Sequence, residues 1–202
     1  MWLLDTGAPA SFGNERAVTI AGERFPVSGG HLGLTTETLS RFVAVECTGL
    51  LGADVLGHLD FVFDVPNQRI AISTGELECS GTAIDLDEYM GIPIAPVRIR
   101  GTDYRMFFDT GAQLSFFEHE SLASFPVAGR VADFYPGLGQ FETETHDVSV
   151  TLGGLDLTLR CGALPEGLGA TLMMAGTNGI IGNQLLGDRR VGYFPRRHAL
   201  VF

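Results

Sequence analysis

The chain has 202 residues, a formal net charge of −11 and 13 basic side chains, all of them arginine. That length allows one or two domains with a substantial core, and a hydrophobic content of 45% excludes a disordered chain. Phosphate binding needs basic patches, so an acidic surface of this kind argues against nucleic acid and anionic membranes as partners.

The three cysteines, Cys47, Cys79 and Cys161, are an odd number without metal-ligand spacing. We therefore expect reduced thiols in a cytoplasmic protein rather than a disulfide framework. The N-terminus lacks the basic region of a signal peptide. Residues 167–187 carry no charge, but their glycines and amides are unsuited to a membrane-spanning helix. We expect a soluble protein.

The first half opens with an apolar run, residues 2–4, that ends at Asp5-Thr6-Gly7-Ala8. A carboxylate at the end of a buried strand is costly unless the site uses it. Alternating apolar residues then predict a hairpin over 17–27, and a strand is expected over 41–45, leading into Leu50-Leu51-Gly52.

Further along, residues 53–59 are expected to form one or two helical turns, and residues 61–72 a hairpin that turns at Pro66-Asn67. The acidic stretch that follows shows little periodicity. We expect a first lobe over residues 1–75, a connection over 76–91 and a second lobe over 92–202.

The second half is longer. A hairpin over 92–108, turning at Gly101, is predicted to lead into Asp109-Thr110-Gly111-Ala112. A short helix is expected over 118–124. Two further hairpins are expected, over 130–141 with a tip at 136–139 and over 148–159, before Ile180-Ile181-Gly182.

The two halves repeat the same landmarks in the same order. Asp-Thr-Gly-Ala-x-x-Ser-Phe begins at both Asp5 and Asp109, and each copy is followed by an apolar pair and glycine. One copy alone would read as an ordinary turn. Two copies predict an internal duplication with a period of roughly a hundred residues, too long for a solenoid. The hairpin over 148–159 matches the one over 17–27, so the first half has lost the segment that the second half carries between its acid and this hairpin. It also lacks a strand to flank Asp5, so either residues further upstream or another segment would fill that position.

Two carboxylates that meet across a pseudo-twofold axis cannot both ionise easily, so they share one proton and their pKa values separate. The ionised acid can then take a proton from a water molecule while the protonated one donates to a substrate carbonyl. This chemistry adds water to an amide bond without a covalent intermediate.

The doubled Asp-Thr-Gly-Ala, each copy with its downstream apolar-apolar-Gly, resembles the aspartic peptidases of the retropepsin and pepsin type. The resemblance covers nearly the whole chain and implies an all-β, bilobal fold with internal pseudo-twofold symmetry. It implies that Asp5 and Asp109 are the catalytic pair. The supporting residues that it implies are Thr6, Gly7, Thr110 and Gly111, and the residues of a substrate-covering flap that it implies are Tyr135, Gly137, Leu138 and Gly139.

On this resemblance we expect a monomeric endopeptidase that cuts peptides or proteins beside apolar residues, with no metal and no cofactor. Pepsins usually carry serine where this chain has Ala8 and Ala112, so we expect a pH optimum less acidic than that of pepsin. Two alternatives stay open. The chain could be an inactive peptide-binding module with the same fold, or it could need a partner protomer to supply the missing strand.

Some of these residues also have simpler interpretations. Gly137 and Gly139 also fit an ordinary surface turn, and Tyr135 also fits a strand aromatic that packs in the core. Phe116, Phe117 and Phe134 could line substrate pockets, but core packing is the better expectation for them.

Overall fold

The computed structural model describes residues 1–117, 119–135, 139–163 and 169–202. Strands hold 51% of the chain and helices 14%, so the protein is mostly β, as the sequence predicted. Within the described residues no helix is both long and apolar enough to cross a membrane.

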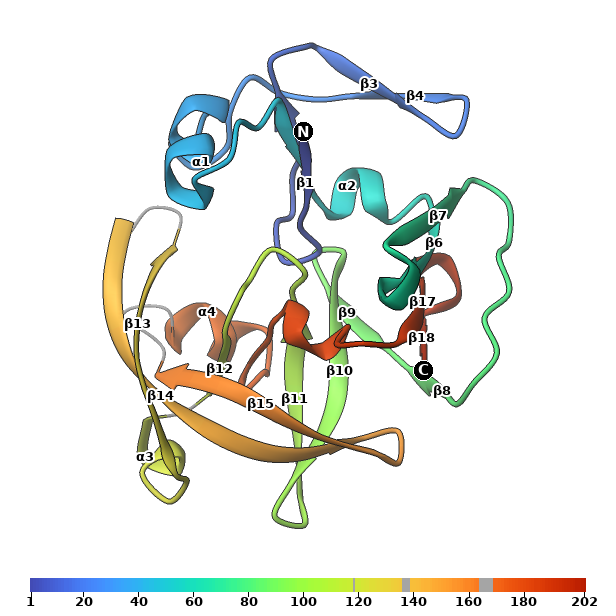
Figure 1. Cartoon of the computed structure of the whole chain (residues 1–202). Coiled ribbons are helices and arrows are strands. Elements are labelled where there is room, and N and C mark those ends of the chain that lie inside the picture. Colours follow the sequence, from blue (N-terminus) through green and yellow to red (C-terminus); the bar gives the residue numbers. More distant parts are fainter. Residues whose placement is uncertain (118, 136–138, 164–168) are drawn as a thin grey trace.

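The first half is built around a small sheet with strand order β1-β5-β2 (Figure 1). Strand β1 runs parallel to β5, with Leu3 opposite Leu50, and β2 runs antiparallel to β5. The hairpin β3–β4 stands beside this sheet as a separate pair. The elements are β1 (Trp2–Leu4), β2 (Phe12–Gly13), β3 (Ala17–Ile20), β4 (Glu23–Pro26), α1 (Thr36–Val43), β5 (Gly49–Leu51), α2 (Ala53–Leu56), β6 (Asp60–Asp64), the 3-10 turn η1 (Val65–Asn67) and β7 (Arg69–Ser73).

The second half forms an eight-stranded sheet with the order β13-β14-β15-β12-β16-β11-β10-β9. The pairing around β11 repeats that around β1, since β11 runs parallel to β16 and β12 runs antiparallel to β16. The elements of the chain after β7 are β8 (Ala83–Asp85), β9 (Asp87–Tyr89), β10 (Ile92–Ile99), β11 (Thr102–Phe108), β12 (Ser115–Phe117), α3 (His119–Leu122), β13 (Val127–Tyr135), β14 (Gly139–Leu152), β15 (Leu155–Ala163), α4 (Gly169–Met174), β16 (Gly179–Ile181), η2 (Asn183–Leu185), β17 (Arg190–Phe194), η3 (Pro195–Arg197) and β18 (Ala199–Val201).

A third sheet joins the two halves of the chain, with the order β7-β6-β17-β18-β8. Strand β6 of the first half pairs with β17 of the second, with Val62 opposite Gly192. One buried cluster extends from Phe61 on this sheet to Phe108 at the end of β11. The two halves therefore share a core.

All five expected hairpins are present. They are the pairs β3–β4, β6–β7, β10–β11, β13–β14 and β14–β15. The short helices expected after residue 52 and after residue 117 are α2 and α3. The stretch expected to connect the halves contains β8 and β9.

The strand expected over residues 41–45 is wrong. Helix α1 occupies Thr36–Val43 because Thr35 caps it. The Thr35 hydroxyl accepts from the Thr38 amide, and the Thr38 hydroxyl accepts from the Thr35 amide. Ala44 ends the helix in the left-handed conformation. The capping box outweighs the strand propensity of Phe42 and Val43.

Strand β1 lies at the edge of its sheet, whereas β11 has β10 along its other side. In the described part of the chain no strand pairs with that edge of β1, which agrees with the expectation that the first half lacks a flanking strand.

Candidate active site

Asp5 and Asp109 occupy matching positions at the ends of two central strands. Asp5 follows β1, and its amide donates to the Leu51 carbonyl at 2.9 Å. Asp109 follows β11, and its amide donates to the Ile181 carbonyl at the same distance. The turns after the two strands meet at the centre of the molecule (Figure 1).

The two carboxylates lie face to face, each against the glycine that follows the other. A side-chain carbon added to Gly111 would stand 2.5 Å from Asp5 Cγ. One added to Gly7 would overlap the carboxylate of Asp109. Only glycine permits this approach, and this is why each acid is followed by Thr-Gly. The structure thus brings together the two acids, which are 104 positions apart in the sequence (109 − 5).

Thr6 and Thr110 cross between the halves and tie the two turns together. The Thr6 hydroxyl donates to the Phe108 carbonyl at 2.6 Å and accepts from the Thr110 amide at 3.0 Å. The Thr110 hydroxyl donates to the Leu4 carbonyl at 2.7 Å and accepts from the Thr6 amide at 3.1 Å. Both side chains are buried. These four bonds fix the spacing of the acids.

Backbone amides from both turns hold the acids in place. Asp5 Oδ1 accepts from Gly7 and Ala8, at 3.0 and 2.9 Å. Asp109 Oδ1 accepts from Gly111 and Ala112, at 2.8 and 3.1 Å. The same loop geometry therefore supports each acid.

The surroundings raise the pKa of both acids, but not equally. Burial raises the pKa of Asp5 well above its ordinary value, and the charge of Asp109 and a hydrogen bond to its side chain raise it further. Burial also raises the pKa of Asp109, but the hydrogen bond with Asp5 and three backbone amides oppose the rise. The two acids therefore titrate as one coupled pair that holds a shared proton above the ordinary pKa of a carboxyl.

Ser11 and Ser115 support the turns from behind. The Ser11 hydroxyl accepts from the Gly52 amide at 2.8 Å, and the Ser115 hydroxyl accepts from the Gly182 amide at 3.1 Å. In the first half the Asp54 carboxylate also accepts from the Ser11 hydroxyl at 2.5 Å and from its amide at 3.0 Å. Sequence reasoning used the serines only as landmarks and missed Asp54, which stands two residues after the first apolar-apolar-Gly.

The hairpin β13–β14 of the second half carries two of the residues expected at the site, Tyr135 and Gly139. Tyr135 is partly buried, and its pKa is raised first by burial and then by the charges of Asp109 and Asp5. Gly139 lies opposite Tyr135 in the hairpin, with a positive φ of 88°. Gly137 and Leu138, also expected at the site, lie outside the described residues.

The three phenylalanines for which core packing was expected have different surroundings. Phe117 is 1% exposed and packs edge-on against Tyr104, and Phe116 is buried beside Phe141. For these two the expectation of core packing is confirmed. Phe134 is partly buried and stacks on Phe42 of α1, a contact that the sequence did not predict.

Each acid has an apolar cluster beside it, and each cluster contacts the alanine of its own Asp-Thr-Gly-Ala. The buried members near Ala8 are Phe12, Leu34, Leu39, Cys47 and Leu50. The buried members near Ala112 are Ile94, Phe107, Leu114, Phe116, Leu172, Ala175 and Ile180.

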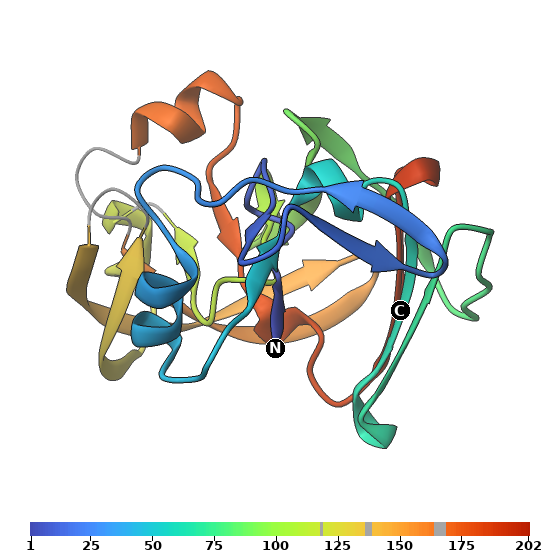
Figure 2. The same ribbon diagram turned by 90° about the horizontal axis from the view of Figure 1, so that it is seen from above.

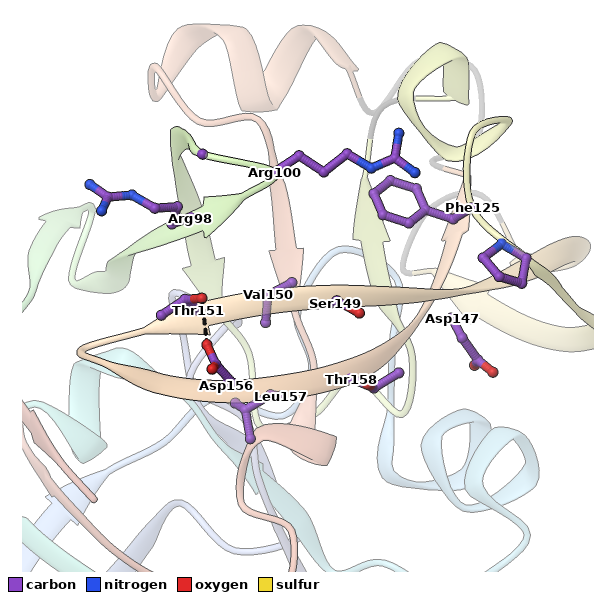
Figure 3. A pocket seen from close by; sticks show the side chains of 12 residues that line it. Arg98, Arg100, Phe125, Asp147, Ser149, Val150, Thr151, Asp156, Leu157 and Thr158 are labelled. Atoms are coloured by element: carbon purple, nitrogen blue, oxygen red, sulfur yellow. Dashed lines mark hydrogen bonds between the residues drawn. The ribbon is translucent and has the colours of Figure 1, made fainter.

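A separate hollow of about 850 Å³ lies between the turn after β10 and the hairpin β14–β15 (Figure 3). It stands at the start of β11, whereas Asp109 follows the end of that strand. Arg98 on its rim pairs with Asp103 at 2.7 Å, and the Thr151 hydroxyl donates to Asp156 at 2.7 Å. This hollow is not part of the site formed by the two acids.

The chain matches no known protein family model, and no curated protein matches it.

Proposed function

We propose that the chain is an aspartic endopeptidase, with two related lobes and the Asp5–Asp109 pair between them. The observation that carries the proposal is the close approach of the two turns, in which each carboxylate packs against the glycine that follows the other acid. Acid pairs of this kind, with separated pKa values, suit general acid–base chemistry on a water molecule. The crossed threonine bonds and the matching amide bonds support the same proposal.

In the proposed mechanism Asp109 acts as the base and Asp5 as the acid. Ionised Asp109 takes a proton from a water molecule, whose oxygen attacks the peptide carbonyl carbon. Protonated Asp5 donates its proton to the carbonyl oxygen, giving a tetrahedral diol. The proton on Asp109 then passes to the amide nitrogen as the C–N bond breaks, and Asp5 recovers a proton from the diol. The water and the two acids suffice for this sequence.

The substrate in this proposal is an extended peptide with apolar side chains on both sides of the cut. An apolar cluster packs against Ala8 and another against Ala112, so the surroundings of both acids are apolar, which supports this preference. The hairpin β13–β14 offers backbone groups to a peptide that binds as an added strand. Tyr135 on that hairpin would contact the peptide above the acids.

The test is cleavage of a broad peptide library by the wild-type chain between about pH 4 and pH 7, followed by mass spectrometry. Asp109→Asn is the main variant, because asparagine keeps the shape but cannot act as the base. Asp85→Asn, which changes an exposed acid on β8, is the matched control. We expect cleavage by the wild type and the control and none by Asp109→Asn. No cleavage by any of them would favour the inactive binding module, and equal cleavage by all three would refute the role of Asp109.

A further inference from the structure

The outer part of the hairpin β13–β14 extends beyond the rest of its sheet. Residues 130–135 of β13 pair with residues 139–144 of β14, whereas β15 pairs with β14 only from Thr145 onward. We call this two-stranded part the arm. Two contacts fix its base to the second half: Phe141 packs against Phe116, and the Ala163 amide donates to the Thr143 hydroxyl at 3.1 Å.

The far end of the arm rests on the first half of the chain. Phe134 stacks on Phe42 of α1, with ring centroids 4.5 Å apart and planes 17° apart. Both rings pack against the buried cluster of the first half that includes Leu39 and Leu50. Figures 1 and 2 both show α1 beside the ends of β13 and β14. The arm is thus supported at one end by each half.

The contact between Phe42 and Phe134 is linked to the acids through Tyr135, the residue that follows Phe134. Successive side chains of a strand point to opposite faces, so Tyr135 faces away from the ring contact of Phe134. Phe134 packs against the same buried cluster as Ala8, the alanine of the turn that carries Asp5. The charges of Asp5 and Asp109 also raise the pKa of the Tyr135 phenol. The contact of Phe134 with α1 therefore constrains the backbone that carries Tyr135.

We propose that Phe42 is a positioning residue of the site: its stack with Phe134 holds the arm against the cluster beside Ala8 and fixes the position of Tyr135. The structural part of this inference stands independently of the proposed function, and its effect on catalysis rests on that function. Helix α1 is a firm support for the arm because the Thr35 cap and the buried Leu39 hold it to the first half.

The test is hydrogen exchange of the folded chain, measured by mass spectrometry on peptides that cover the arm. The variants are Phe42→Ala, Phe134→Ala and the double variant, with Phe42→Tyr as the conservative replacement. Phe63→Ala is the matched control, because Phe63 is also a partly buried ring that stacks on another, Phe61, away from the arm.

A stacked aromatic pair is worth enough for its loss to speed exchange in the arm by about five- to tenfold. We expect this increase in both single variants, no further increase in the double variant, and near wild-type exchange in Phe42→Tyr and Phe63→Ala. Exchange over residues 145–162 should not change. Unchanged exchange in the arm of Phe42→Ala would overturn the proposal, and so would a uniform increase along the whole chain.

The same variants separate this inference from the proposed function. In an active peptidase, a loosened arm weakens peptide binding, so we expect Phe42→Ala to raise KM several-fold more than it lowers kcat, and Phe42→Tyr to restore KM. If the wild type cleaves no peptide, the exchange result still decides whether Phe42 holds the arm. If KM and kcat stay at wild-type values while exchange in the arm rises, the positioning role fails.

Discussion

At the scale of single residues, the site consists of two acids with the same supports. Asp5 and Asp109 have matching strands, matching glycines and matching amide bonds, and burial raises the pKa of both. Because the folded state favours the protonated form of Asp5, it binds more protons than the unfolded chain above about pH 4. Stability therefore falls as pH rises from there through the raised pKa.

This predicts that Asp5→Asn stabilises the folded chain at neutral pH. Asparagine can still accept from the amides of Gly7 and Ala8, but it removes the charge that burial disfavours. Thermal unfolding of the variant and the wild type between about pH 3 and pH 8 measures the effect. We expect a higher Tm for the variant at pH 7 and a difference that shrinks toward zero in acid. A difference independent of pH would contradict the prediction.

The hydrogen bonds of Thr6 and Thr110 between the two halves lead to a second prediction at this scale. Thr6→Ala leaves the Phe108 carbonyl and the Thr110 amide without their buried partner. We expect the free energy of unfolding to fall by about 2–3 kcal/mol. Thr151→Ala, which removes an exposed hydroxyl bound to Asp156, should cost no more than about 0.5 kcal/mol. Denaturant unfolding measures both variants. If both lost the same free energy of unfolding, the crossed threonine bonds would contribute no more to stability than an exposed hydrogen bond does.

The sequence predicted the acids, glycines and threonines of the site because each copy of the motif confirms the other. It did not predict the partners that come from distant segments. Nothing near Phe42 in the sequence indicates that Phe134, 92 positions later (134 − 42), will stack on it. The role of Asp54 could have been predicted, because it lies two residues after Gly52, in a motif that was already recognised.

At the scale of elements, hairpins were predictable and α1 was not. Alternation with period two and glycine turns indicate hairpins directly. In α1 the segment Phe42-Val43-Ala44-Val45 favours a strand, and the signals that decide are the Thr35 cap and the helical spacing of Leu39 and Phe42. Local propensity was overruled by a cap and by burial of one helix face.

The cap of α1 can be tested directly. Thr35→Ala removes the hydroxyl that accepts from the Thr38 amide and should lower the free energy of unfolding by about 1 kcal/mol. Thr35→Ser keeps a hydroxyl and should cost much less. Chemical denaturation measures both variants, and equal losses would mean that the capping box does not hold the helix.

At the scale of the whole molecule, the third sheet makes the two halves depend on each other. Asp60 at the start of β6 is fully buried and binds Arg196 at 2.9 Å and Arg197 at 2.6 Å, both near the C-terminus. The Leu77 amide also donates to Asp60 at 3.0 Å. The repeat predicted two lobes with a connection between them, but strand pairing across this sheet could not be predicted from either half alone.

We therefore predict a single unfolding transition that is sensitive to Asp60. Asp60→Ala removes the buried carboxylate that accepts from Arg196, Arg197 and the Leu77 amide, and should lower the free energy of unfolding by about 2–3 kcal/mol. Asp103→Ala breaks an exposed pair with Arg98 and should cost less than about 1 kcal/mol. Calorimetry is the measurement. Two separate transitions, with only one shifted by Asp60→Ala, would contradict the prediction.

The pH dependence of the cleavage rate, measured on one peptide from the library, tests the central claim most directly. Two acids that share a proton should give a bell-shaped profile with two apparent pKa values. Because Ala8 and Ala112 bring no hydroxyl to the acids, we expect the maximum well above about pH 2. We expect Asp109→Asn to abolish cleavage over the whole pH range. A profile that Asp109→Asn leaves unchanged would contradict it.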